Sequence, residues 1–319
     1  MNKNLIRSLL RDGSGITKQE MAARTGLSVA SCNTFLNELA QSGEVVSEKQ
    51  RLREVGPGTA VYRLNEDYES ILCVIFQMIR QIKTIKEVVL TPTGRVREQW
   101  EQSFDYLDAA CIERHIEQAF GRYGNISRIV LGTPSIAEHG VIRHCDIREL
   151  ENADIVRQLE ARFGRPVFLE NDMHLKVFGY YCHEGRPEGI ITLGCFPSGV
   201  LPGTASICNG TVLRGKNQFA GMVGFMDYGR SMDEVMAALQ SKEAAWPLIV
   251  KAMTAIISVL NPHRIVLSGD LLDEAAVARI PMECCRTVPG EYMPEISYIE
   301  NIDQYYLEGM FQRAVKARQ

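Results

Sequence analysis

The chain has 319 residues, of which 45% are hydrophobic, so it is long enough for two or three domains with apolar cores. No segment approaches the roughly 20 consecutive apolar residues that cross a bilayer, and the first residues lack the apolar run of a secretory signal, so we expect a cytoplasmic protein with no membrane partner. None of the nine cysteines forms a C-x-x-C pair, which argues against a zinc site and favours reduced, mostly buried thiols.

The formal net charge of −4 is unevenly distributed along the chain. Residues 1–64 contain nine basic and six acidic side chains, whereas the remainder contains 26 basic and 33 acidic ones, so the two parts have net charges of +3 and −7. A basic first segment before an acidic body is typical of a DNA-binding module joined to another domain. We expect this module to occupy residues 1–66.

The first segment predicts three helices. Residues 4–11 have apolar side chains at helical spacing and end at an Asp-Gly pair. The second helix begins after Thr17, which has a glutamate three residues later in capping-box register, and ends at a Thr-Gly pair where glycine permits a left-handed turn. Ser28 caps a third helix that runs to about residue 41. Its predicted buried face consists of Val29, Cys32, Phe35, Leu36 and Leu39.

The turn between the second and third helices has the spacing of a helix-turn-helix. The exposed face of the third helix carries short polar side chains that can bond base edges or phosphates in a major groove. Residues 44–64 then predict a hairpin with a basic tip, the wing, which would contact the phosphate backbone. The residues expected to contact duplex DNA are Thr17, Ser28, Ala30, Ser31, Asn33, Thr34, Asn37, Lys49, Arg51 and Arg53. The alternative is a small helical subdomain, or a helix-turn-helix used for protein contacts.

From residue 67 onward, strand-like apolar runs alternate with helical stretches, which is typical of an α/β fold with a mainly parallel sheet. Strands are predicted at residues 71–76, 84–90, 128–132, 167–170, 190–194, 205–208 and 264–267. Helices are predicted at residues 106–123, 155–163, 173–182, 232–241 and 243–260. A hairpin is expected around Gly140.

The order of these segments, with a winged head in front, resembles the ROK family of repressors and sugar kinases. Residues 131–135 stand where the family has a G-x-P-G turn, residues 170–172 match its E-N-D segment, and residues 219–226 are similar to its G-x-A-G-E-I-G-H-M segment. Residues 261–269 resemble the strand and turn near its adenosine pocket. The resemblance covers nearly all of the chain.

The resemblance implies an actin-like (RNase H-like) ATPase fold of two lobes. The first lobe is expected at residues 67–182, with a C-terminal helix at residues 303–319 packing back on it. The second lobe is expected at residues 183–302.

Several residues that the family uses for kinase chemistry are missing. The first strand of the body has Phe76-Gln77-Met78 in place of a D-x-G turn, and residues 194–197 replace the second phosphate loop, G-T-G, with Gly-Cys-Phe-Pro. Phosphoryl transfer depends on positioned phosphates and neutralised charge, so we expect no ATP binding, no cofactor and no enzymatic activity. Phe225 stands at the position of the family's zinc-binding histidine, so no metal is expected either.

The resemblance implies that Asn171 and Asp172 contact sugar hydroxyls, with Thr133, Pro134 and Ser135 of the preceding turn beside them. In the family the aspartate is also the general base, a role that has no use without a phosphoryl donor in line. The alternative is that Asn171 and Asp172 only cap the helix that follows them.

The sequence thus predicts a transcription regulator, most simply a repressor, whose partner is a double-stranded DNA operator and whose degenerate kinase body senses a sugar or a related small molecule. Symmetric operators favour two-fold assemblies, so we expect a homodimer or a dimer of dimers. Two alternatives remain: a body that dimerises without binding a ligand, and an active sugar kinase.

Overall fold

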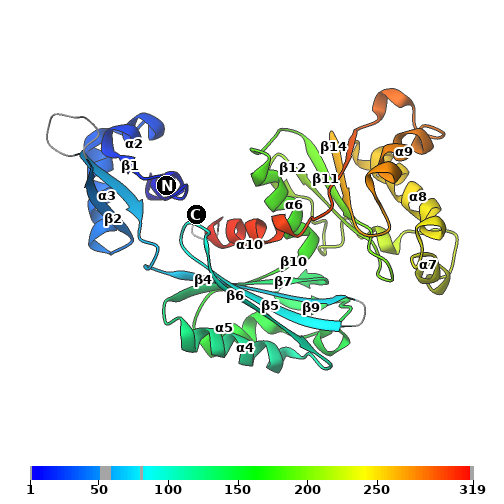
Figure 1. Cartoon of the computed structure of the whole chain (residues 1–319), viewed down its shortest axis with the longest axis horizontal. Helices are drawn as coiled ribbons and strands as arrows, with labels where there is room; N and C mark the ends of the chain where they lie inside the picture. Colours follow the sequence, from blue (N-terminus) through cyan, green and yellow to red (C-terminus); the bar gives the residue numbers. More distant parts are fainter. Residues whose placement is uncertain (1, 51–58, 80–81, 317–319) are drawn as a thin grey trace.

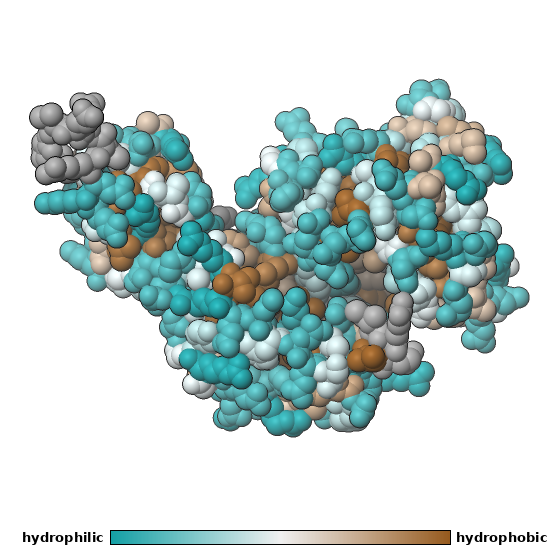
Figure 2. All heavy atoms as spheres, viewed as in Figure 1, coloured by the Kyte–Doolittle hydropathy of each residue, from teal (hydrophilic) through white to brown (hydrophobic). Residues whose placement is uncertain are grey.

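The computed structural model describes residues 2–50, 59–79 and 82–316, which form a small head and two larger lobes (Figure 1, Figure 2). The head is a three-helix unit with a three-stranded sheet, and each lobe is built on a five-stranded sheet. The α/β class and the order of a winged head followed by a two-lobed body are as predicted.

The head contains three helices and a sheet of strand order β1-β3-β2. Its elements are α1 Asn2–Leu10, β1 Ile16–Thr17, α2 Lys18–Thr25, α3 Val29–Gln41, β2 Val45–Gln50 and β3 Thr59–Leu64. The tip of the hairpin, residues 51–58, lies outside the described residues.

The helix boundaries of the head follow the local signals in its sequence. The Thr17 hydroxyl accepts a hydrogen bond from the Glu20 amide (3.2 Å) and the Glu20 carboxylate accepts one from the Thr17 amide (2.8 Å), which completes the capping box. Gly26 ends α2 with a φ of 70°, a conformation that favours glycine. One expectation is wrong: Val29 is 46% exposed, because the buried stripe of α3 begins one turn later.

The first lobe has a mixed sheet in the order β10-β7-β4-β5-β6. Its strands are β4 Ser70–Ile79, β5 Ile82–Leu90, β6 Val96–Phe104, β7 Ile126–Thr133 and β10 Val167–Asn171. Helices α4 Ala109–Arg122 and α5 Ile155–Phe163 cover one face, and α10 Gln304–Lys316 covers the other (Figure 1). Strands β8 Ile136–Glu138 and β9 Val141–Arg143 form the expected hairpin around Gly140.

The second lobe has a sheet in the order β13-β12-β11-β14-β15. Its strands are β11 Ile190–Cys195, β12 Gly203–Cys208, β13 Thr211–Val212, β14 Arg264–Ser268 and β15 Glu295–Tyr298. Helices α7 Met232–Ala238, α8 Lys242–Leu260 and α9 Glu274–Cys284 cover one face. The described residues of this lobe also form the 3-10 helices η2 Val223–Phe225 and η3 Gly290–Tyr292, and η1 Arg148–Leu150 belongs to the first lobe.

Helix α6, Asp172–His183, packs on the other face of this second sheet, although the sequence-based boundary at residue 182 assigned it to the first lobe. It crosses α10 with the two backbones in contact. A Cβ atom on Gly179 would lie 1.9 Å from the Tyr305 carbonyl oxygen, and one on Gly309 would lie 1.9 Å from the Leu175 carbonyl oxygen. The two glycines therefore let α6 and α10 bring the lobes together.

Among the described helices, α8 alone has the length and apolar composition of a membrane span. Its buried side chains form the core beneath the second sheet, together with β14 and α9, so packing inside the lobe accounts for much of its hydropathy. These side chains are Ala245, Leu248, Ile249, Ala252, Met253, Ile256 and Ile257.

Candidate DNA-binding surface and inter-lobe cleft

The outward face of α3 carries most of the residues predicted to contact DNA. Ala30, Thr34 and Asn37 are exposed, and Ser31 and Asn33 are half-buried. The Asn33 side-chain oxygen accepts a hydrogen bond from the Lys18 ammonium group, so its amide nitrogen remains as the donor to a ligand. Figure 1 shows α3 and β2 on the side of the head away from the second lobe, where a duplex could approach them.

The remaining predicted DNA contacts have different surroundings. Ser28 caps α3, where its hydroxyl accepts a hydrogen bond from the Ser31 amide (3.1 Å). Thr17 is only 6% exposed, and its hydroxyl is engaged in the capping box, so its side chain does not belong to the DNA-facing surface. Lys49 is exposed on β2. Arg51 and Arg53 lie outside the described residues.

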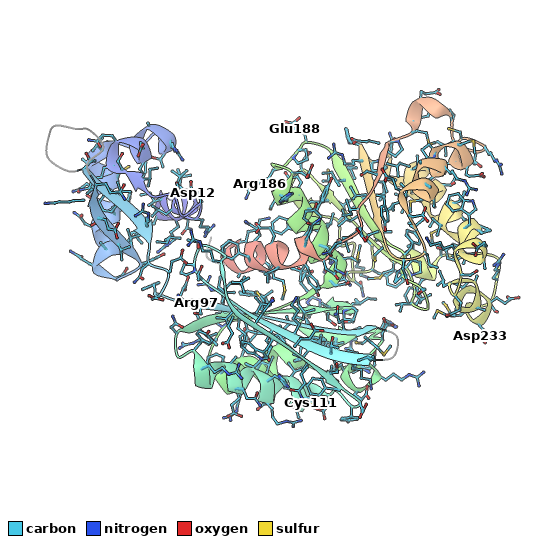
Figure 3. All side chains as sticks on the ribbon, viewed as in Figure 1. Asp12, Arg97, Cys111, Arg186, Glu188 and Asp233 are labelled. Atoms are coloured by element: carbon cyan, nitrogen blue, oxygen red, sulfur yellow. The ribbon has the colours of Figure 1, made fainter. Side chains whose placement is uncertain are left out.

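Charged side chains of the first lobe hold the segment that joins the head to the body. Arg97 of β6 donates hydrogen bonds to the Glu66 carbonyl and to the Asp67 carboxylate (2.8 Å), at the junction visible in Figure 3. Arg128 of β7 binds the Glu69 carboxylate (2.9 Å) and the Ala314 carbonyl at the end of α10 (3.0 Å). The head is thereby anchored to both the first sheet and α10.

A cavity of about 160 Å³ lies between the lobes, and it brings together four of the five predicted ligand-binding residues. Pro134, Ser135, Asn171 and Asp172 line it. Thr133 is fully buried, and its hydroxyl lies 2.7 Å from the Ser135 hydroxyl. It therefore stabilises the 133–135 turn and does not line the cavity.

Asn171 uses both its side-chain oxygen and its side-chain nitrogen in hydrogen bonds inside the protein. Its oxygen accepts hydrogen bonds from the Met173 and His174 amides (2.9 and 3.2 Å), and its nitrogen donates to the Ser135 carbonyl (3.0 Å). It therefore caps α6 and fixes the 133–135 turn against that helix.

Asp172 is paired with a lysine that the sequence analysis missed. The Lys176 ammonium lies 3.1 Å from the Asp172 carboxylate and 3.0 Å from that of Asp303, and it sits 5.0 Å from the centre of the Tyr306 ring. Burial opposes the charge of Lys176, but the two carboxylates outweigh it and hold the Lys176 pKa above its usual value. The signal in the sequence was a lysine one helical turn after Asp172.

The loop after β11 stands where the family has its second phosphate loop. Its backbone amides donate hydrogen bonds to other groups of the protein. The Phe196 side chain is buried and its amide bonds the Ser268 carbonyl (2.9 Å). The Ser198 amide and hydroxyl both donate to the Asp270 carboxylate (2.6 and 2.7 Å). A phosphate group would have to displace a carboxylate from these donors, so the residues present do not fit a bound nucleotide triphosphate.

The zinc site that the resemblance implies does not fit either. Phe225 is 47% exposed at the mouth of the cleft, where its ring packs against those of Phe219 (5.5 Å between centroids) and His144 (6.4 Å). Within residues 2–50, 59–79 and 82–316, no three histidine, cysteine, aspartate or glutamate side chains converge to hold a metal ion.

Glu170 ties the first sheet to the second lobe. Its carboxylate accepts hydrogen bonds from His174 (3.1 Å) and from Arg214 in the loop after β13 (2.8 Å). Burial raises the Glu170 pKa, but the hydrogen bonds from His174 and Arg214 outweigh it and lower the pKa to about 2. This glutamate was recognised only as the first residue of the E-N-D motif, and here it serves as a structural contact between lobes.

The head and the two-lobed body define a winged helix-turn-helix protein with a sugar-kinase-like domain, and sequence comparison gives the same class. A winged helix-turn-helix DNA-binding profile matches residues 2–45, and the ROK family profile matches residues 70–234. The chain belongs to the ROK family.

Individual relatives are distant. A curated relative, "Putative xylose repressor" of Caldicellulosiruptor sp. (strain Rt8B.4), is 23% identical over 234 residues, which are 71% of this chain. The match spans 58% of the length of that relative.

Solved structures share the fold. A ROK family transcriptional regulator, a homologue of the E. coli Mlc protein, has a TM-score of 0.71 and 15% identity, with 98% of each chain covered. The ROK hexokinase of Thermus thermophilus has a TM-score of 0.61 and 18% identity, and the match covers 78% of this chain and 99% of the hexokinase.

Proposed function

We propose that this protein is a DNA-binding transcription regulator of the repressor type, whose sugar-kinase-like body does not phosphorylate sugars. The observation that carries the proposal is the winged head, in which α3 exposes short polar side chains beside a hairpin, in a segment of net charge +3. Such side chains can bond base edges in a major groove, and the cations of the wing can neutralise phosphates. Family membership and the repressor relative support the same function.

The proposed partner is an operator bound by two heads, because helix-turn-helix proteins read paired half-sites through two-fold symmetry. Selection of bound duplexes from a random pool by the full chain, followed by footprinting, tests this. We expect a palindromic site with half-sites one or more helical turns apart. If no sequence is enriched over the starting pool, the proposed DNA-binding function is wrong.

Two contacts support an inactive body. Asp172, at the position of the family's general base, is neutralised by Lys176, and the Ser198 donors at the phosphate loop are held by Asp270. The ion pair occupies the carboxylate that would have to accept a proton from a sugar hydroxyl, and a carboxylate at the phosphate loop repels ATP.

We therefore expect the purified protein to show no ATP-dependent phosphorylation of glucose, mannose or xylose in a coupled assay, at enzyme concentrations where a ROK hexokinase turns over readily. Asp172→Asn should leave this background unchanged. Turnover in the wild type that disappears in Asp172→Asn would show that the body is an active kinase.

The cleft is the proposed site of a small effector, and the resemblance to sugar kinases makes a sugar or a sugar derivative the first class to consider. An effector acts by binding one arrangement of the lobes more tightly than another. The second candidate is a body that only dimerises, and the internal hydrogen bonds of the Asn171 amide, which occupy its oxygen and one N–H, favour it.

A further inference from the structure

Asp146 is an exposed acidic side chain in the cleft for which the described residues provide no partner. Asp146 follows β9 and lines both the inner cavity of about 160 Å³ and an adjoining outer cavity of about 530 Å³. Within the described part of the chain, its carboxylate makes no hydrogen bond or ion pair. The junction of the two cavities therefore carries an uncompensated negative charge.

No cation of the described residues offsets this charge from the cavity wall. The lining of the inner cavity contains two carboxylates, Asp146 and Asp172, but neither lysine nor arginine among the described residues. Lys176 lies behind Asp172 and is shared with Asp303. Although Asp146 is exposed, partial desolvation in the cleft, and then the nearby Asp172, raise its pKa.

The rest of the cavity is mainly apolar. Met173, Met222 and Phe225 line it together with prolines and aliphatic side chains of the second lobe. A wall of this kind gives few donors and acceptors to a molecule with many hydroxyl groups, whose unpaired polar groups would be costly to bury.

Two aromatic rings line the cavity, one from each lobe. The rings of His144, from the first lobe, and Phe225, from the second lobe, are 6.4 Å apart at a steep angle, and Phe219 contacts Phe225 (5.5 Å between centroids). The faces of such rings attract cations, most strongly where a carboxylate is also near. The site thus combines one free negative charge, an apolar wall and an aromatic rim.

We propose that the cleft binds a small amphipathic amine, with its ammonium group on Asp146 and its apolar part against Met222 and Phe225. This proposal rests on the proposed regulator function, for which it names the class of effector. The volume suits a ligand with one ring, because a cavity of about 150 Å³ holds a benzene molecule. Sugar phosphates are disfavoured, since their negative charge would face that of Asp146.

Calorimetric titration of the full chain at neutral pH tests this with four probes: benzylamine, benzyl alcohol, glucose and glucose 6-phosphate. We expect benzylamine to bind at least about tenfold more tightly than benzyl alcohol, a difference of about 1.4 kcal/mol. Glucose 6-phosphate should bind most weakly. Asp146→Asn should weaken benzylamine binding about tenfold and leave the affinity for benzyl alcohol unchanged.

Glu188→Gln is the matched control, because it removes one carboxylate from an exposed position at the far end of the second lobe (Figure 3). It should leave benzylamine affinity unchanged. Phe225→Leu keeps the apolar wall but removes the aromatic face. It should therefore weaken the binding of benzylamine more than the binding of benzyl alcohol.

Three results would overturn the proposal: equal binding of benzylamine and benzyl alcohol, no binding of any probe, or tightest binding of glucose or its phosphate. Benzylamine affinity that survives Asp146→Asn would also overturn it. DNA binding of the same preparations, measured by fluorescence anisotropy, reports on the regulator function separately. A failure of the amine proposal is thus distinguishable from a failure of the proposed function.

Discussion

Gly309→Ala is expected to lower the free energy of unfolding by about 3 kcal/mol or more, because the added Cβ would lie 1.9 Å from the Leu175 carbonyl oxygen. The clash is with backbone, so no side chain can rotate away to relieve it. Helix α6 is held by the second sheet and α10 by the first, so neither can retreat without opening the contact between the lobes. Chemical denaturation of the wild type and the variant measures the change.

Gly121→Ala is the control for this prediction. Gly121 lies near the end of α4, and a Cβ there meets no atom within 4 Å. Alanine has the higher helix propensity by about 1 kcal/mol, so this variant should be as stable as the wild type or more stable. If Gly309→Ala unfolds at the same denaturant concentration as Gly121→Ala, the close crossing of α6 and α10 is wrong.

Removal of both wing arginines, Arg51→Ala with Arg53→Ala, is expected to weaken DNA binding by roughly ten- to a hundredfold at moderate salt. Each arginine that contacts a phosphate releases counterions, so the slope of log affinity against log salt should become shallower by about 2. The loss should be similar for operator and unrelated duplexes, because phosphates carry no base information. Anisotropy titrations over a range of salt concentrations measure both quantities.

The matched control removes two arginines from the body, Arg157→Ala with Arg286→Ala, and thus changes the net charge equally. Both side chains are highly exposed, with 82% and 74% of their surface accessible. This control should leave the salt slope unchanged. If the wing variant keeps the wild-type slope of log affinity against log salt, residues 51–58 are not a phosphate-binding wing, even if the affinity has changed.

The failures of the sequence analysis have a common cause. It missed β6 and β15, which are edge strands of their sheets with few buried side chains, so their sequences lack the apolar run or alternation that marks a strand. It also missed α9, which contains a proline at residue 281 and buries only Val277, Ile280 and Cys284. These segments take their structure from contacts with neighbouring elements, and their own hydrophobic pattern does not predict it.

The successes have an equally local origin. The capping box at Thr17, the glycine at residue 26 and the serine at residue 28 each act within a few residues, so the sequence alone determined the helix-turn-helix and its boundaries. The buried strands were predicted because both of their faces are covered, which leaves continuous apolar runs.

What the cleft can do was decided only by the tertiary structure. Lys176 reaches Asp303, in the turn before α10, 127 positions further along the chain, and Ser198 reaches Asp270 across 72 positions. Among the described residues that the two lobes bring to the cavity wall, Asp146 has no cationic partner, and no spacing in the sequence predicts this. Short-range hydrogen bonds and apolar periodicity depend on residues that are close in the sequence. The net charge around a cavity depends on segments that come together only after folding.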